Sequence, residues 1–248
     1  MKLIVEICCG SYYDAKSAAL GGAKRIELNS ALHLGGLTPS LGTLKKVKED
    51  FDLEVICMVR PRGAGFHYND EDFMVMKEDA RLLLENGADG LAFGVLDENG
   101  NIDVKRNQEI IAIIKEYGKT AVFHRAFDCV SDPYKACETL IEMGVDRILT
   151  SGLKNKAIEG INLIKELQAR YGDKIQFLAG SGMNASNAKE MITTTGIYQV
   201  HSSCKDWLTD PTTSGDEVTY AYAPQPHEND YDVVSQALVE KIVAAVNK

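Results

Sequence analysis

Short runs of apolar and β-branched residues recur along the chain and predict buried strands. Each run is only a few residues long and is bounded by glycine or polar residues, which favours a strand over a buried helix. Eight such runs occur, at residues 3–8, 25–29, 54–59, 90–95, 120–124, 146–151, 175–179 and 198–202.

Segments with helical periodicity lie between these strands. Asn69 is placed to cap one helix, and its apolar face repeats at a spacing of three to four residues through Phe73, Met76, Ala80 and Leu83. Two further helix starts combine a capping residue with a following proline, at Thr38–Pro39 and Asp132–Pro133. The chain therefore alternates strand and helix from beginning to end.

The C-terminal part predicts a long connection and a last helix. We expect the helix over residues 231–248, with a packed side formed by Val234, Leu238, Val239, Ile242 and Val246. The connection 204–229 is too long for a plain turn, so we expect a lid over a pocket or a subunit contact. Its candidate interface anchors are Trp207, Tyr220 and Tyr222.

A helix-ending glycine precedes every second strand, which is a weak internal repeat. These glycines are Gly22, Gly87, Gly144 and Gly196. Eight strand and helix pairs in 248 residues predict an α/β protein with a single (β/α)₈ barrel over residues 1–248. The alternative is a doubly wound open sheet, but its usual G-x-G-x-x-G turn after the first strand is missing.

Charge and cysteine usage narrow the expected partners and compartment. The 27 Lys and Arg residues against 36 Asp and Glu residues give a net charge of −9, and no basic block is present. We therefore expect neither nucleic acid nor a membrane surface as a partner. The first ten residues resemble neither a signal peptide nor a membrane span, and six cysteines lack a C-x-x-C motif. A cytoplasmic protein with free thiols is predicted.

Polar residues gather where the predicted strands end, which is where barrels of this kind carry their sites. Because side chains alternate along a strand, Glu6 and Glu27 lie opposite their apolar neighbours and should point into the barrel. Buried carboxylates need partners, and we expect Arg60, Arg62 and Arg125 to provide them.

The stretch "TAVFHRAFD" ends a strand with an imidazole, a guanidinium and a carboxylate. Together with the two glutamates it predicts proton transfer by Glu6, Glu27, His124 and Asp128. A structural network of ion pairs is the alternative reading of the same charges. Metal ligation by His124 and Asp128 ranks second to an anion or acid/base pocket.

Glycine and serine follow the seventh and eighth strands, where many barrels hold a phosphate. A helix capped by Asn184 or Ser186 would direct its positive end toward this pocket. The predicted partner of this pocket is a small anionic molecule, and the predicted anion-binding residues are Arg60, Arg62, Arg125, Ser151, Gly180, Ser181, Gly182, His201 and Ser202.

Metal ligands do not form a compact set in the sequence. Soft ligands for Cu(I) would have to converge in space from Cys8, Cys57 and Cys204. The ligands of a metal ion are therefore left open at this stage.

Five segments form a set that extends along nearly the whole chain. They are "GGAKRIELNSALHLGGLTPS", "MVRPRGAGFHYND", "VFHRAFD", "RILTSG" and "AGSGM". Together they resemble the copper homeostasis protein CutC family. The resemblance implies a cytoplasmic (β/α)₈ barrel that associates with itself and has a role in copper homeostasis through copper binding, with a copper ion as a further predicted partner and no organic cofactor. It also implies that Asn29 stands where relatives often carry cysteine.

Two functions remain open from the sequence. One is copper binding, which the family resemblance favours. The other is a barrel enzyme that acts by acid/base chemistry on a small phosphorylated or carboxylated metabolite, which the converging charges favour.

Overall fold

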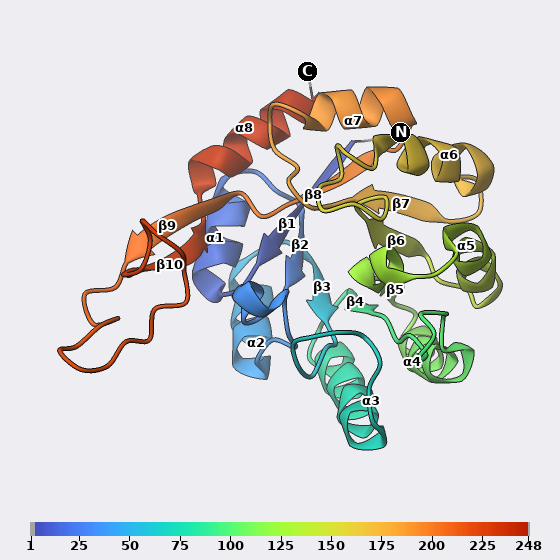
Figure 1. Cartoon of the computed structure of the whole chain (residues 1–248), viewed down its shortest axis with the longest axis horizontal. Coiled ribbons are helices and arrows are strands. Elements are labelled where there is room, and N and C mark those ends of the chain that lie inside the picture. Colours follow the sequence, from blue (N-terminus) through green and yellow to red (C-terminus); the bar gives the residue numbers. More distant parts are fainter. Residues whose placement is uncertain (1–2, 248) are drawn as a thin grey trace.

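Eight parallel strands close into a barrel, and helices surround it (Figure 1). The computed structural model describes residues 3–247. Each strand pairs with the next along the chain, and the first pairs with the eighth, which confirms the predicted (β/α)₈ barrel. The barrel strands are β1 (Ile4–Cys9), β2 (Arg25–Leu28), β3 (Glu54–Met58), β4 (Gly90–Phe93), β5 (Thr120–Phe123), β6 (Arg147–Thr150), β7 (Gln176–Ala179) and β8 (Gln199–Ser202).

Within residues 3–247, eight α-helices follow the eight barrel strands. None of these helices has the length and apolar character needed to cross a membrane. They are α1 (Tyr12–Leu20), α2 (Leu41–Asp50), α3 (Asp70–Glu85), α4 (Val104–Glu116), α5 (Pro133–Glu142), α6 (Ile161–Tyr171), α7 (Ala188–Thr195) and α8 (Gln236–Asn247).

Local capping chemistry sets most helix ends. The predicted caps Asn69 and Asp132 are confirmed, because their side chains accept hydrogen bonds from the first turns of α3 and α5. Thr38 is not a cap: Ser40 caps α2, and the Thr38 hydroxyl is hydrogen-bonded to the backbone of Arg60 instead.

The start of α7 also differs from the prediction. Neither Asn184 nor Ser186 caps it, since the helix begins after Asn187. The Asn184 side chain accepts the backbone N–H of Ser186 in a turn before the helix. The four predicted helix-ending glycines all have positive φ, between 80° and 97°, which is the left-handed backbone conformation that commonly ends an α-helix.

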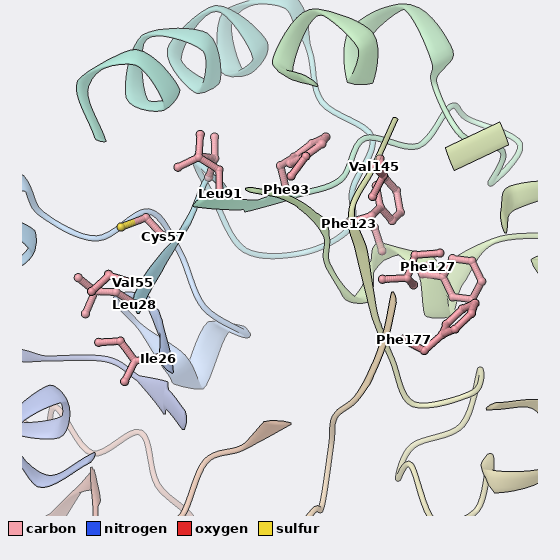
Figure 2. Close-up of a cluster of buried hydrophobic side chains, with 14 of the residues drawn as sticks. Ile26, Leu28, Val55, Cys57, Leu91, Phe93, Phe123, Phe127, Val145 and Phe177 are labelled. Atoms are coloured by element: carbon pink, nitrogen blue, oxygen red, sulfur yellow. The ribbon is translucent and has the colours of Figure 1, made fainter. Parts of the chain in front are cut away.

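The hydrophobic core has an outer layer between strands and helices and a smaller part inside the barrel. Outward-facing residues of neighbouring strands, such as Ile26, Val55 and Leu91, pack under the helices (Figure 2). One inner apolar group comes from β3, β4 and β5, and its members are Ile56, Met58, Ala92 and Val122. On β6 and β7, the side opposite the outward-facing Ile148 and Phe177 carries the buried Leu149 and Leu178. The inner side of β1, β2 and β8 is polar, with Glu6, Arg25 and His201.

The segment after β8 forms a two-stranded antiparallel ribbon of β9 (Lys205–Thr209) and β10 (Asp230–Val234). The ribbon lies beside α1 and extends outward from the ring of helices, so it does not form the expected lid (Figure 1). It touches the barrel rim where the Tyr222 ring lies 4.6 Å from His33. Trp207 stacks on His227 within the ribbon.

The predicted last helix begins too early in the sequence-based assignment. Residues 230–234 belong to β10, because they pair with β9 in antiparallel register. The Val234 N–H also donates a hydrogen bond to the Asp14 side chain, which joins the ribbon to α1. Val239, Ile242 and Val246 are buried as predicted, whereas Leu238 is 36% exposed. Alternating burial in a short amphipathic segment cannot distinguish strand from helix when a partner strand is distant in sequence.

The contact between α1 and α8 gives a test of this packing. A Cβ added to Gly21 would lie 2.5 Å from Val239 Cβ; Gly21 directly follows α1 and Val239 lies in α8. Gly21→Ala should therefore reduce the free energy of unfolding by about 1–3 kcal/mol. Urea denaturation measures this change. Gly65→Ala is the control, since nothing lies within 4 Å of its added Cβ, and equal losses in both variants would contradict the packing argument.

Candidate functional site

Three strands place a carboxylate, a guanidinium and an imidazole side by side inside the barrel. Glu6 on β1 pairs in register with Arg25 on β2 and with His201 on β8. Glu6 Oε2 lies 2.6 Å from Arg25 Nε, and Glu6 Oε1 lies 2.8 Å from His201 Nδ1. The Arg25 contact is an ion pair without a well-aligned hydrogen bond. The inward orientation of Glu6 agrees with the alternation argument.

The arginines that neutralise Glu6 are different from those expected. Arg25 is its direct partner, and Arg147 Nη1 lies 3.9 Å from the same oxygen. Gln199 accepts a 2.6 Å hydrogen bond from Arg25 Nη2. Burial opposes ionisation of Glu6, but Arg25 and His201 outweigh it and hold the pKa of Glu6 at about 2. Glu6 is therefore a permanent anion in the folded protein at neutral pH.

A thiol, a carboxylate and an imidazole form a second cluster next to this ion pair. One ligand atom each from Cys8, Glu27 and His201 lie within 4.8 Å of one another. Asn29 Nδ2 connects two of them, at 3.0 Å from Glu27 Oε2 and 3.6 Å from Cys8 Sγ. Glu6 holds the Nδ1 side of His201, so Nε2 is the nitrogen that faces Glu27. We call Cys8, Glu27 and His201 the CEH cluster.

Burial and mutual contact shift the acidities within the CEH cluster. Burial raises the pKa of Glu27, although the nearby His201 charge and the Asn29 hydrogen bond oppose this. Burial also raises the pKa of the Cys8 thiol, against the effect of His201. For His201, burial favours the neutral form, but Cys8 and Glu6 outweigh it and raise the pKa well above its ordinary value.

The three cysteines expected to converge do not do so. Cys57 lies on the outer side of β3 with Val55 and Leu91, under the helices (Figure 2). Cys204 follows β8 and contacts the Ser202 hydroxyl at 3.5 Å. Only Cys8 belongs to a metal-compatible cluster in the described part of the chain. Side chains alternate between the inside and the outside of the barrel along a strand. Cys8 points inward and Cys57 points outward, so the two thiols cannot meet.

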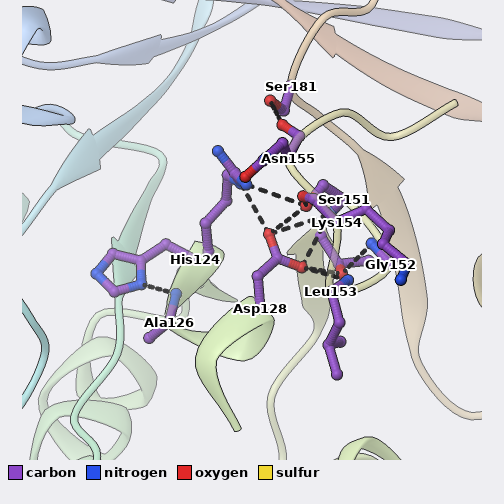
Figure 3. A network of polar contacts seen from close by, with 11 residues as sticks. His124, Ala126, Asp128, Ser151, Gly152, Leu153, Lys154, Asn155 and Ser181 are labelled. Carbon is purple, nitrogen blue, oxygen red and sulfur yellow. Dashed lines mark hydrogen bonds and ion pairs between the residues drawn. The ribbon is translucent and has the colours of Figure 1, made fainter. Parts of the chain in front are cut away.

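Asp128 organises the loop after β6 (Figure 3). Its carboxylate accepts hydrogen bonds from the Thr150 hydroxyl at 2.6 Å and from the backbone N–H groups of Ser151 and Leu153 at 2.9 and 3.3 Å. Arg125 Nε lies 2.8 Å from the other oxygen, and Arg125 also contacts the Ser151 hydroxyl. These bonds use most of the acceptor capacity of the Asp128 carboxylate. Asp128 thereby holds the loop in place.

His124 points away from this network (Figure 3). Its Nδ1 accepts the backbone N–H of Ala126 at 3.1 Å, and the imidazole is 2% exposed. Burial, together with the charge of Arg60, lowers the pKa of His124 to about 3. The ring is therefore neutral at physiological pH. The structure thus separates His124 from the Arg125 and Asp128 side chains that follow it in sequence.

The other two predicted arginines contact groups outside the barrel interior. Arg60 donates from its terminal nitrogens to the backbone carbonyls of Leu34, Gly36 and Ala64. Arg62 forms a 2.7 Å ion pair with Asp72 and is 41% exposed at its side chain. Neither is a partner of Glu6 or Glu27, so that expectation is wrong.

The glycine and serine turns occupy two different places. Gly180 lies inside the barrel, where an added Cβ would be 3.4 Å from the His201 ring. The Ser181 hydroxyl donates to the carbonyl of Asn155, and Gly182 has positive φ in the same turn. The Ser202 hydroxyl donates to the carbonyl of Met183, away from the interior. The turns therefore do not present a single row of hydroxyl groups.

Sequence reasoning missed the interior residues Arg25, Arg147 and Gln199. The same alternation that oriented Glu27 also places Arg25 inward, because the two are separated by one residue in β2. Likewise, Gln199 shares the inward side with His201 in β8. The alternation of residues in β2 and β8 therefore already indicated Arg25 and Gln199, but the prediction chose the arginines near the strand ends as partners of the glutamates.

The depressed pKa of Glu6 predicts a specific acid sensitivity. Its pKa falls from an ordinary 4.5 to about 2 on folding, so the unfolded chain binds more protons in this window. This carboxylate therefore contributes about 3 kcal/mol above pH 4.5, and the contribution is lost as pH falls through about 2. Urea unfolding of the wild type and Glu6→Gln measures it. The stability difference should shrink on acidification, and a constant difference would contradict the assignment.

Comparison with known proteins agrees with the barrel fold. Residues 3–206 match the CutC family. A CutC family protein of Treponema denticola is 45% identical over 98% of both chains. The human copper homeostasis protein cutC homolog is 43% identical, covering 82% of this chain and 73% of that one. A crystal structure of CutC from Streptococcus agalactiae is 32% identical, with a TM-score of 0.77 over 81% of this chain and 98% of that one. The chain belongs to the CutC family.

Proposed function

We propose that this protein takes part in copper homeostasis by binding a copper ion at the CEH cluster. The observation that carries the proposal is the meeting of Cys8 Sγ, His201 Nε2 and a Glu27 oxygen within 4.8 Å. A thiolate and an imidazole suit Cu(I), whereas a carboxylate is a harder ligand. Cys8 and His201 would therefore hold the ion, with Glu27 beside it.

The surroundings of the CEH cluster support a ligand role for His201. Glu6 fixes Nδ1 of the ring at 2.8 Å and is itself held by Arg25. A carboxylate behind a metal-binding histidine fixes the ring orientation and increases its basicity. Asn29 Nδ2 lies 3.6 Å from Cys8 Sγ and supplies an amide there, not a second thiol. The cluster in this chain would thus bind copper with one thiolate.

We also propose that the protein acts in the cytoplasm. The support is the state of the six cysteines, all of which are free thiols. Free thiols are typical of a reducing compartment.

A second candidate function is acid/base catalysis on a small carboxylated or phosphorylated metabolite. The raised pKa of Glu27, caused first by burial, favours it, because perturbed carboxyl groups are frequent in active sites. The other assigned residues support it less: Glu6 stays ionised, the pKa of His124 is about 3, and Asp128 is fully engaged in a loop. Copper binding is therefore the better supported function.

Substitutions at Cys8 and Asn29 test the copper proposal in opposite directions. Cys8→Ser should abolish stoichiometric Cu(I) binding, since it removes the only thiol of the CEH cluster. Asn29→Cys should tighten binding about tenfold or more, because it adds a thiolate close to Cys8 Sγ. Anaerobic competition against a Cu(I) chelator measures both.

The matched control for these variants is Cys129→Ser, which removes an exposed thiol away from the barrel interior. It should leave the affinity unchanged. Unchanged binding in Cys8→Ser, or an equal loss in Cys129→Ser, would show that copper is bound adventitiously elsewhere.

Self-association through the ribbon is a further part of the proposal. Tyr220 on its loop is 83% exposed, and tyrosine is enriched among the residues that contribute most to subunit contacts. Sedimentation should therefore show an oligomer that Tyr220→Ser weakens. Tyr117→Ser, at an exposed position directly after α4, is the control. A wild-type monomer would refute this part.

A further inference from the structure

A cavity of about 300 Å³ lies between the barrel mouth and the ribbon. The start of α1 and the loops after β1 and β2 form one side, and Tyr222 with residues 231–233 forms the other. The hydrogen bond from the Val234 N–H to Asp14 fixes the ribbon beside α1 there (Figure 1). The carboxyl ends of the strands are where barrels of this kind carry their sites. We call this cavity the tyrosine pocket, and its aromatic and acidic lining residues are Tyr13, His33, Tyr222, Tyr231, Asp14 and Asp232.

Aromatic rings line the tyrosine pocket on both sides. Tyr13 and His33 belong to the barrel side, whereas Tyr222 and Tyr231 belong to the ribbon. The ring centroids of His33 and Tyr222 are 4.6 Å apart, so the two sides are in contact. The three tyrosine side chains are 42–51% exposed, which leaves their rings accessible to a ligand. Because the face of a tyrosine ring attracts positive charge, this lining favours a cation.

Two carboxylates line the same pocket, and within residues 3–247 no Lys or Arg side chain lines it. Asp14 is 2% exposed, and its two oxygens accept the backbone N–H groups of Val234 and Gly10, both at 2.8 Å. Burial raises the pKa of Asp14; these two hydrogen bonds oppose this effect, and the charge of Asp232 adds to it. The two carboxylates are thus close enough to repel each other. A cation bound in the tyrosine pocket would relieve this repulsion.

Asp232 and Tyr222 are held together as one unit. The Tyr222 hydroxyl donates to Asp232 Oδ1 and accepts the backbone N–H of Asp232 at 2.9 Å. In the described part of the chain, this arrangement leaves Oδ2 of Asp232 for another donor. An aromatic ring and a carboxylate oxygen are therefore offered side by side. A guanidinium group suits this pair, because it is planar, stacks on aromatic faces and donates to carboxylates, whereas an ammonium group is more strongly hydrated.

We propose that the tyrosine pocket binds the guanidinium group of a small molecule. Asp232 Oδ2 would accept its N–H groups, a tyrosine ring would stack on its plane, and Asp14 would add the second negative charge. The volume of the cavity is at the lower end for ligand pockets, so it fits a small molecule. The inference does not rest on copper binding, because the tyrosine pocket and the CEH cluster share no residue in the described chain.

Butylguanidinium is the probe for this site, and butylurea is its uncharged counterpart of similar planar shape. Calorimetric titration of the full-length protein at constant ionic strength should show saturable binding of butylguanidinium, with butylurea weaker by about tenfold or more. Asp232→Asn should weaken butylguanidinium binding by about the same factor, since it removes the charge but keeps an oxygen for the Tyr222 hydroxyl. The matched control is Asp173→Asn, which removes an exposed carboxylate between α6 and β7, at the opposite end of the barrel.

Two substitutions of Tyr231 test the aromatic contribution. Tyr231→Leu should weaken butylguanidinium binding by about two- to fivefold, because it removes a ring that attracts the cation. Tyr231→Phe keeps the ring and should retain the wild-type affinity. Equal affinities of the Leu and Phe variants would contradict a role of this ring in binding.

Absence of saturable binding, equal affinities for butylguanidinium and butylurea, or equal losses in Asp232→Asn and Asp173→Asn would each overturn the proposal. Butylammonium bound as tightly as butylguanidinium would overturn the assignment to a guanidinium group. Without ligand, Asp232→Asn should melt at or above the wild-type temperature, and a lower value would refute the repulsion between the two carboxylates. Sedimentation with butylguanidinium is the last test. Dissociation of an oligomer would assign the tyrosine pocket to an arginine of a second copy and overturn the small-molecule ligand.

Discussion

The ion pair between Glu6 and Arg25 is the contact on which the polar half of the barrel interior depends. Both side chains are 2% exposed, so neither charge is solvated by water. Removing one partner would leave an uncompensated buried charge, at a cost of about 3–5 kcal/mol. Glu6 also fixes the His201 ring, and through it the ion pair reaches the CEH cluster. Stability and the geometry of the candidate copper site are therefore linked through one carboxylate.

The side chains inside the barrel are apolar on some strands and polar on others. On β3, β4 and β5 it is apolar, and the mouth above it carries Arg60 and His124. Around β1, β2 and β8 it is polar, and the CEH cluster lies there. A buried charge needs a partner, and on the polar side Glu6, Arg25 and His201 provide one another with partners.

Strand alternation and helix capping, which can be read from neighbouring residues in the sequence, predicted much of this structure. Strand alternation placed Glu6 and Glu27 inside, and capping chemistry located helix starts at Asn69 and Asp132. These predictions failed where a distant partner competes with a local one. Thr38 is hydrogen-bonded to the Arg60 backbone instead of capping a helix, and residues 230–234 pair with β9 instead of extending α8.

The sequence by itself determined the barrel, the inward direction of its charged residues and the family, because periodicity and motifs are local properties of the chain. Only the tertiary structure decided which charges meet. Arg25 instead of Arg60 neutralises Glu6, and Cys8 joins His201 rather than another cysteine. Such pairings join strands that are far apart in sequence. Alternation within one strand gives the direction of a side chain but does not identify its partner on the neighbouring strand.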